Sequence, residues 1–204
     1  MTLIEDVIPS KISFENDTKA YIIGGNTGTE KITATGKGGY TASGAGDVTL
    51  NVILAGNAEL EKIGSGNLTL TANNTFSGKV KLKSGVINAE SNTALGTGDI
   101  EITGDGAQAV LDLNADNLSI ANKIKIKDKG KGGPVSIRLN TDNFTGELSG
   151  EINIEEKDER GFQVNISTGA ILTLSGKVTG GKGGKGGDGS GITTTGTGTL
   201  VLSN

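Results

Sequence analysis

The sequence contains no cysteine, no histidine and no tryptophan. Without cysteine the chain has no disulfide, no thiolate metal site and no cysteine nucleophile. Without histidine it lacks the commonest general base and metal ligand. Because there are only four phenylalanines and two tyrosines, a packed core has to be built almost wholly from isoleucine, leucine, valine and alanine. These absences argue against an enzyme.

Charge and hydropathy exclude further classes of protein. The net charge is −4 with both signs interspersed, which offers no electrostatic basis for binding nucleic acid. No apolar run approaches the ~20 residues that a membrane-spanning helix needs. The opening residues lack the basic and apolar regions of a signal peptide, so for an exported protein the targeting segment is expected outside this sequence. Two prolines and the lack of a three-residue glycine period exclude collagen.

Glycine and alternating aliphatic residues are abundant. The chain has 35 glycines among 204 residues, more than twice the average share of about 7 %. Apolar residues recur at positions i and i+2 between glycine- or asparagine-rich turns, which is typical of short strands with one buried face. No convincing helical period occurs, so the fold class is all-β. The pairs are Val48/Leu50, Leu68/Leu70, Val80/Leu82, Ile100/Ile102, Leu111/Leu113, Leu118/Ile120, Ile124/Ile126, Ile137/Leu139, Ile152/Ile154, Val164/Ile166, Leu172/Leu174 and Leu200/Leu202.

Internal repeats favour a solenoid over a sandwich or a barrel. Residues 62–70 match 194–202 at an offset of 132, and residues 48–50 match 172–174 at an offset of 124. The difference of 8 predicts an insertion in the glycine- and lysine-rich tract at 180–191. A weaker match places Asn74–Gly78 against Asp142–Gly146 at an offset of 68.

Residues 62–98 carry an ordered set of motifs. These are K-x-G-x-G-x-L-x-L in Lys62–Leu70, N-T-aromatic-S-G in Asn74–Gly78, G-x-(I/L) in Gly85–Ile87 and A-L-G-x-G in Ala94–Gly98. The set resembles the passenger-associated β-strand repeat of Gram-negative autotransporters. The resemblance is weaker over the first 45 residues, and Thr194 stands where the first copy has Lys62.

The resemblance implies a right-handed parallel β-helix, exported through an outer-membrane barrel that lies outside this chain. With about 20–28 residues per coil, the chain is expected to form eight or nine coils. We expect one continuous β-solenoid over 1–204. Its parts are less typical N-terminal coils at 1–47, a repeat-like unit at 48–179, the inserted loop at 180–191 and the start of the next repeat at 192–204.

Charged residues predict which strands stack. The outward positions around Val80/Leu82 and Ile124/Ile126 are lysines, whereas those around Ile100/Ile102 and Ile152/Ile154 are acidic. If these four strands share one face, their signs alternate from rung to rung and oppose a slip in register. We therefore predict that reversing the charge of Lys81 and Lys125 destabilises the fold and that Glu101→Lys partly restores it. The residues are Lys79, Lys81, Lys83, Asp99, Glu101, Lys123, Lys125, Lys127, Glu151 and Glu155.

Motifs for chemistry are few. The acidic run Glu155–Glu159 could suggest glycoside hydrolysis, but the interleaved Lys157 favours a solvated loop, and the neighbours Lys83 and Ser84 make a poor catalytic dyad. Residues 183–188 fit half of a calcium-binding nonapeptide with Asp188 as the candidate ligand, but no tandem copy supplies opposing ligands. The run Lys123–Lys131 could attract anionic polysaccharide, and a solvated strand face is favoured. No catalytic residue and no cofactor are predicted.

The favoured function is a non-catalytic extracellular scaffold, a passenger stalk at the bacterial cell surface. One alternative is a filament subunit that stacks end to end through open solenoid ends. A polysaccharide-active β-helix enzyme is the least favoured alternative. The expected partners are a second copy of the chain, or a host surface or polysaccharide, and not nucleic acid.

Overall fold

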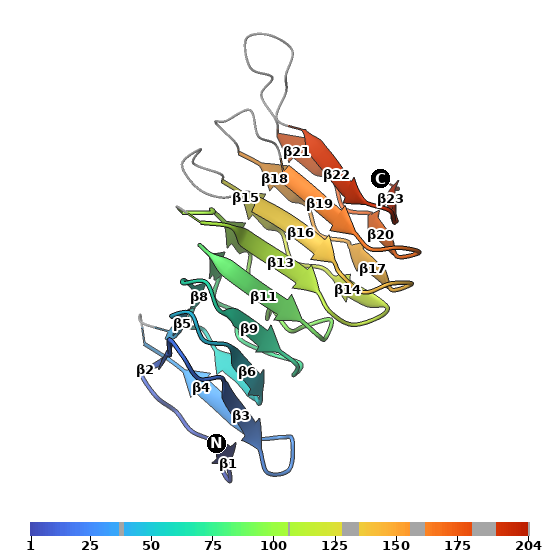
Figure 1. Cartoon of the computed structure of the whole chain (residues 1–204). Coiled ribbons are helices and arrows are strands. Elements are labelled where there is room, and N and C mark those ends of the chain that lie inside the picture. The colour runs from blue at the N-terminus through green and yellow to red at the C-terminus, as the bar shows by residue number, and fades with distance from the viewer. Residues whose placement is uncertain (37–38, 106, 128–134, 156–161, 181–190, 204) are drawn as a thin grey trace.

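The computed structural model is a parallel β-solenoid of about seven turns, close to the eight or nine expected. It describes all residues except 37–38, 106, 128–134, 156–161, 181–190 and 204. Successive turns stack along one axis, and the two ends of the chain lie at opposite ends of the stack (Figure 1). Within the described residues there is no helix, and so none that could cross a membrane.

The strands lie on three sides of the solenoid. The first side is a nine-stranded sheet, ordered β1 (Thr2–Leu3), β3 (Tyr21–Gly25), β6 (Val48–Asn51), β9 (Asn67–Leu70), β11 (Gly85–Ala89), β13 (Ala109–Leu113), β16 (Val135–Leu139), β19 (Phe162–Ile166) and β22 (Ile192–Gly196). The second is an eight-stranded sheet, ordered β2 (Lys11–Glu15), β5 (Gly39–Ser43), β8 (Leu60–Lys62), β10 (Val80–Leu82), β12 (Ile100–Ile102), β15 (Ile124–Ile126), β18 (Ile152–Ile154) and β21 (Val178–Gly180).

The third side is interrupted. Its strands form a two-stranded sheet, β4 (Lys31–Ala34) and β7 (Ile53–Gly56), and a four-stranded sheet, β14 (Leu118–Ile120), β17 (Thr145–Leu148), β20 (Ile171–Leu174) and β23 (Thr199–Leu202). Between these two sheets, residues 71–79 and 90–99 cross the third side without a strand. Here buried Asn74 connects three turns, because its Oδ1 accepts from Leu54 N (2.8 Å) and its Nδ2 donates to Ala94 O (2.6 Å). One amide side chain thus replaces ladder bonds that the backbone does not make.

The core is a single narrow column of mostly aliphatic side chains, with a few buried aromatic rings. Every i, i+2 pair from Val48/Leu50 to Leu172/Leu174 points inward and is buried, and these residues belong to one cluster. Burial of such a side chain contributes about 1.5–3 kcal/mol. Turn length varies from 19 residues, between Leu68 and Ile87, to 30 residues, between Val164 and Thr194. This variation is taken up at the corners.

The repeat matches relate different sides of the solenoid. Val48–Leu50 lies in β6 of the nine-stranded sheet, whereas Leu172–Leu174 lies in β20 of the four-stranded sheet. The match at offset 132 likewise pairs β9 with β23. A glycine corner followed by alternating aliphatics serves all sides equally, so a local match does not identify the side. The weaker match at offset 68 relates equivalent positions in two turns, because Phe76 and Phe144 both follow a strand of the nine-stranded sheet. The division of the chain at residues 48, 180 and 192 stays a prediction.

Candidate functional site

The most distinctive surface is the outer face of the eight-stranded sheet, which we name the charged face. Val80, Ile100, Ile124 and Ile152 are aligned in register on β10, β12, β15 and β18. Their side chains are buried, and the residues between and beside them face solvent. The predicted stacking of these four strands on one face is therefore confirmed, and with it the alternation of lysine and carboxylate rungs.

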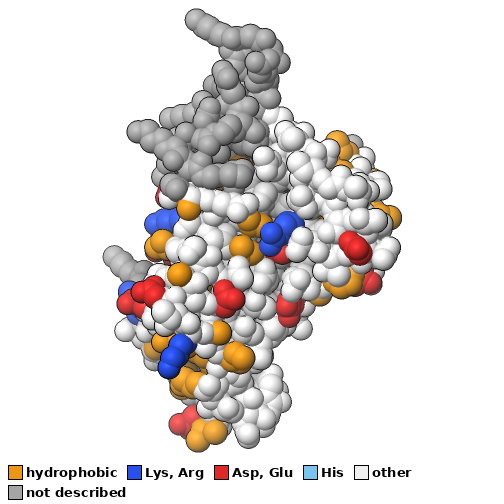
Figure 2. Space-filling view, viewed as in Figure 1, with side chains coloured by type: hydrophobic (Ala, Val, Ile, Leu, Met, Phe, Trp, Pro, Cys, Tyr) orange, Lys and Arg blue, Asp and Glu red, His pale blue; other side chains and the backbone are white. Residues whose placement is uncertain are grey.

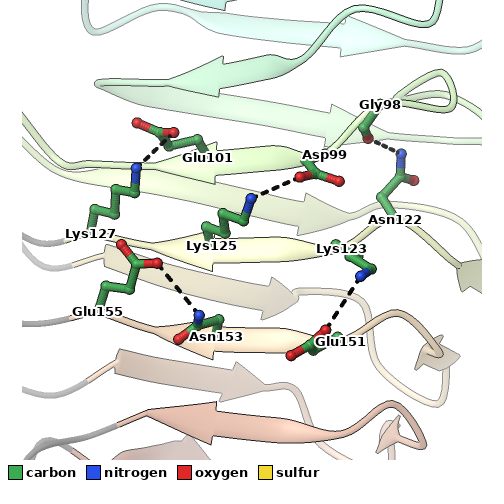
Figure 3. A network of polar contacts seen from close by, with 10 residues as sticks. All are labelled: Gly98, Asp99, Glu101, Asn122, Lys123, Lys125, Lys127, Glu151, Asn153 and Glu155. Carbon is green, nitrogen blue, oxygen red and sulfur yellow. Dashed lines mark hydrogen bonds and ion pairs between the residues drawn. The ribbon is translucent and has the colours of Figure 1, made fainter.

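The ion pairs of the charged face run diagonally as well as straight across (Figure 3). Lys125 Nζ lies 2.9 Å from Asp99 Oδ2 and Lys127 Nζ lies 3.1 Å from Glu101 Oε2, each two positions away from the directly opposite residue. Lys123 Nζ lies 3.5 Å from Glu151 Oε2. A long lysine side chain reaches such diagonal neighbours easily.

The charged face contains one further rung that was not predicted from the sequence. Glu59 and Glu61 flank Leu60 on β8, and Lys81 Nζ lies 2.6 Å from Glu59 Oε2. Lys83 forms an ion pair with Glu61. The signal was present in the sequence, because these carboxylates precede Lys79, Lys81 and Lys83 by about one turn of the solenoid. The alternation of sign therefore begins one rung earlier than predicted.

The pKa shifts on this face follow from the ion pairs. The hydrogen bond from Lys125 lowers the pKa of the Asp99 carboxyl, and the same contact raises the pKa of Lys125. The hydrogen bond to Glu59 raises the pKa of Lys81. The paired side chains of Lys125 and Asp99 keep about a third of their surface in water, so each pair contributes only about 0.2–1 kcal/mol. Their main effect is on register.

These pairs also bear on ligand binding. Lys123, Lys125 and Lys127 each have a carboxylate partner, so the described part of the lysine run carries no large excess of positive charge. A hollow of about 250 Å³ on this face is lined by Asp99, Lys123 and Glu151 among others. Lys129 and Lys131 lie outside the described residues. Binding of an anionic polysaccharide stays a prediction, and the solvated strand face remains favoured.

We expect a double-mutant cycle on Asp99 and Lys125 to give a coupling free energy of about 0.2–1 kcal/mol. Asp99→Lys and Lys125→Asp should each destabilise the fold, and the double variant should recover part of the loss. Denaturant unfolding measures all four proteins. Glu101 lies directly opposite both Lys81 and Lys125, so the rescue by Glu101→Lys stays a prediction. The ion-pair partner of Lys125 is Asp99, and that of Glu101 is Lys127. Equal coupling for the pair Glu101 and Lys125 would contradict this assignment.

A buried lysine occupies the corner between β8 and β9. Lys62 is 2 % exposed, and its Nζ donates to the carbonyl oxygens of Ile63 and Gly64, both at 2.9 Å. Ser84 of the next turn closes the same corner, with its hydroxyl accepting from Gly64 N at 2.8 Å. The lysine of the K-x-G-x-G motif therefore caps a turn. Burial lowers the pKa of Lys62 to about 8, partly opposed by the charge of Asp47.

The lowered pKa of Lys62 predicts that the free energy of unfolding rises at alkaline pH. Its pKa is about 8 in the folded chain and about 10.5 in the unfolded chain, so between these values the unfolded state binds more protons. The free energy of unfolding should then increase with pH over that interval. In Lys62→Met this increase should disappear. Chemical denaturation at intervals from pH 7 to pH 10 tests the point, and an unchanged slope in the variant would refute it.

The sequence-derived catalytic and metal candidates do not come together as a site. Ser84 is buried and its hydroxyl is engaged with Gly64, while Lys83 pairs with Glu61 at the surface. Glu155 follows β18 and is exposed, whereas the rest of the acidic run at 156–159 lies outside the described residues, as does the calcium candidate Asp188. Within the part of the chain that the structure describes, no group of three metal-ligating side chains is found.

A second polar cluster lies on the four-stranded sheet and was not foreseen. Glu147 Oε2 accepts from the hydroxyl of Ser119 at 3.0 Å, and its other oxygen accepts from Ser175. These hydrogen bonds lower the pKa of Glu147, with that from Ser175 first. A shallow hollow of about 310 Å³ covers this part of the sheet. Since the three residues come from separate turns, only the stacking of the turns assembles the cluster.

Comparison with known proteins agrees with the fold. The chain is 30 % identical over 184 residues, 86 % of its length, to the adhesin BmaC autotransporter of Brucella suis biovar 1 (strain 1330). The chain is a β-solenoid of the autotransporter-passenger type. This passenger-type solenoid spans 5 % of the length of that relative. No protein-family model matches the chain, and no solved structure matches it.

Proposed function

We propose that this chain is an adhesin-like, non-catalytic passenger scaffold that is secreted or displayed at the bacterial cell surface. The observation that carries the proposal is the nine-stranded parallel sheet, which runs from Thr2 to Gly196 through every turn. Such a stack holds its ends at a fixed separation, because each turn advances the axis by about 4.8 Å and every rung is hydrogen-bonded to the next.

Two further features support the proposal. The similarity to an autotransporter adhesin covers most of the chain, which fits export through an outer-membrane barrel. The lack of cysteine and histidine in the whole sequence removes the usual nucleophile, base and metal ligands of enzymes. The charged face keeps the turns in register, which suits a spacer.

Surface display tests the proposal. The chain, fused to the translocator barrel of an autotransporter and carrying an epitope tag, should be detected on intact Gram-negative cells and should resist added protease. The Gly64→Ala variant is the matched control for export without stable folding. Retention of the wild-type chain in the periplasm, or its complete digestion on the cell surface, would overturn the proposal.

Catalysis is tested separately on purified protein. A panel of neutral and acidic polysaccharides should release no reducing sugar, with Glu155→Gln as the comparison variant. Hydrolysis by the wild-type chain that this substitution abolishes would favour a polysaccharide-active enzyme instead.

A further inference from the structure

The outer face of the four-stranded sheet is rich in hydroxyl groups and poor in charge. Within its described strands β14, β17, β20 and β23, Glu147 is the one charged residue. The nine-stranded sheet is also poor in charge, since acidic and basic side chains are scattered among uncharged groups on the face shown in Figure 2. Both surfaces differ from the charged face, where ion pairs join carboxylates to lysines of neighbouring turns.

Glu147 keeps hydrogen-bonding capacity for a ligand. An ionised carboxylate can accept about four hydrogen bonds, and the half-buried Glu147 accepts one at each oxygen, from Ser119 and from Ser175. Within the described part of the chain, no lysine or arginine forms an ion pair with it. The two hydroxyl donors lower the pKa of Glu147, so the carboxylate is ionised at neutral pH. Its charge is therefore balanced only by neutral donors.

Asn117 supplies hydrogen-bond donors on the neighbouring turn. It is exposed in the turn before β14, with φ +58°, and its Oδ1 accepts from the Thr145 hydroxyl at 2.9 Å. Its Nδ2 makes no hydrogen bond to the described residues, so two N–H donors are available. Because Leu118 is aligned with Gly146, Asn117 lies diagonally across from Glu147. Both side chains line the shallow hollow of about 310 Å³.

The size and the chemistry of this hollow fit one neutral sugar ring. Its volume of about 310 Å³ lies at the small end of the range of ligand sites, roughly 300–1,000 Å³. A sugar hydroxyl both donates and accepts, so neighbouring hydroxyls can satisfy the Glu147 oxygens and the Asn117 N–H groups together. An anionic sugar would be repelled by the carboxylate. The hollow on the charged face offers no such acceptor, because Asp99 and Glu151 already lie beside lysines.

We propose that this hollow binds a neutral hexopyranose, with Glu147 accepting from one ring hydroxyl and Asn117 donating to a neighbouring one. The described lining residues include no aromatic ring, so binding buries little apolar surface and a single site is expected to be weak, with millimolar affinity. The proposal adds a ligand to the passenger scaffold. It does not depend on surface display, because binding is measured on the purified chain.

An NMR titration of the isotope-labelled chain tests the proposal. The probes are the methyl glycosides of glucose, galactose and mannose, with sodium glucuronate as the anionic comparison. At least one neutral glycoside should shift the signals of the Asn117 side-chain amide and the Gly146 N–H until they saturate. Added sodium chloride should not weaken this binding, because no ion pair forms. Glucuronate should bind about fivefold more weakly or less, owing to the charge of Glu147.

Two variants and a matched control connect the binding to this hollow. Glu147→Gln keeps the shape of the side chain and removes its charge, so the neutral glycoside should bind about tenfold more weakly. The discrimination against glucuronate should disappear in the same variant. Asn117→Gly keeps the left-handed backbone and removes the amide donors, so it should also weaken binding. Glu151→Gln, the same change at the hollow of the charged face, should leave binding unchanged.

Several results would overturn the proposal. They are the absence of saturable shifts at Asn117 and Gly146 with all three glycosides, equal binding of glucuronate by the wild-type chain, and unchanged affinity in Glu147→Gln. Circular dichroism verifies that each variant is folded. None of these results changes the outcome of the surface-display experiment, so failure of the sugar site is distinguished from failure of the scaffold function.

Discussion

Replacing Gly64 with alanine is expected to lower the free energy of unfolding by about 2–5 kcal/mol. Gly64 has φ +83°, and a Cβ there would lie 2.4 Å from Gly44 O and 2.6 Å from Gly44 N of the preceding turn. The left-handed conformation costs an L-residue about 1–2 kcal/mol, and a forced contact in a packed region costs about 1–3 kcal/mol. The neighbouring backbone has little room to yield, since Gly64 itself is held by Lys62 and Ser84.

Gly28→Ala is the matched control for this prediction. Gly28 has φ +80°, nearly the same as Gly64, but a Cβ there would meet no atom within 4 Å. Gly28→Ala should therefore lower the free energy of unfolding by about 1–2 kcal/mol, which is the conformational cost alone. Guanidinium unfolding of both variants measures the difference, which reports the close stacking of turns at the corner. Equal losses for the two glycines would show that stacking contributes nothing there.

Replacing Tyr40 with phenylalanine is expected to lower the free energy of unfolding by about 2–4 kcal/mol. Tyr40 is fully buried and points from β5 toward the two-stranded sheet. Its hydroxyl accepts from Ala34 N (3.0 Å) and Ala55 N (3.2 Å), and it donates to one of the carbonyls of Ile32 and Ala55. Each buried donor left without a partner costs about 1–3 kcal/mol. The ring remains in place beside Phe76, so no large cavity complicates the comparison.

Tyr21→Phe is the control for the hydroxyl. Tyr21 is 43 % exposed at the N-terminal end, and loss of its hydroxyl should change the free energy of unfolding by no more than about 0.5 kcal/mol. The same denaturant series measures both variants. If Tyr40→Phe were as mild as Tyr21→Phe, the buried hydroxyl would not be connecting β4 and β7. Because burial raises the pKa of Tyr40, the contrast should hold throughout the neutral range.

The stacking order of the charged strands could be predicted because two signals agreed. Val80, Ile100, Ile124 and Ile152 repeat at about one turn, and the charges beside them alternate in sign. The partner within each ion pair could not be predicted, since a lysine reaches a diagonal carboxylate as readily as an opposite one. Only the tertiary structure shows that Asp99 is the partner of Lys125.

The roles of Lys62 and Asn74 could not be predicted from the sequence. A lysine in a glycine-rich motif reads as exposed, yet Lys62 is buried because three backbone carbonyls converge at its corner. Asn74 reads as a turn residue, yet it spans three turns of the solenoid. The partners of Asn74, and Ser84 beside Lys62, lie about twenty residues away in the sequence, and no local pattern contains that information.

The sequence by itself determined the strand content and the inward aliphatic pairs, because a two-residue period and glycine corners are properties of short segments. Its internal repeats favoured the solenoid over a sandwich or a barrel. It did not determine which side a segment occupies, as the matches of Val48–Leu50 with Leu172–Leu174 showed. The tertiary structure decides this, because the lengths of successive corners add up along the chain. Their sum sets the phase of every later strand, that is, the side of the solenoid on which it lies. The buried contacts of Asn74 with Leu54 and Ala94 follow from the same phase, because only stacked turns bring these partners within hydrogen-bonding distance.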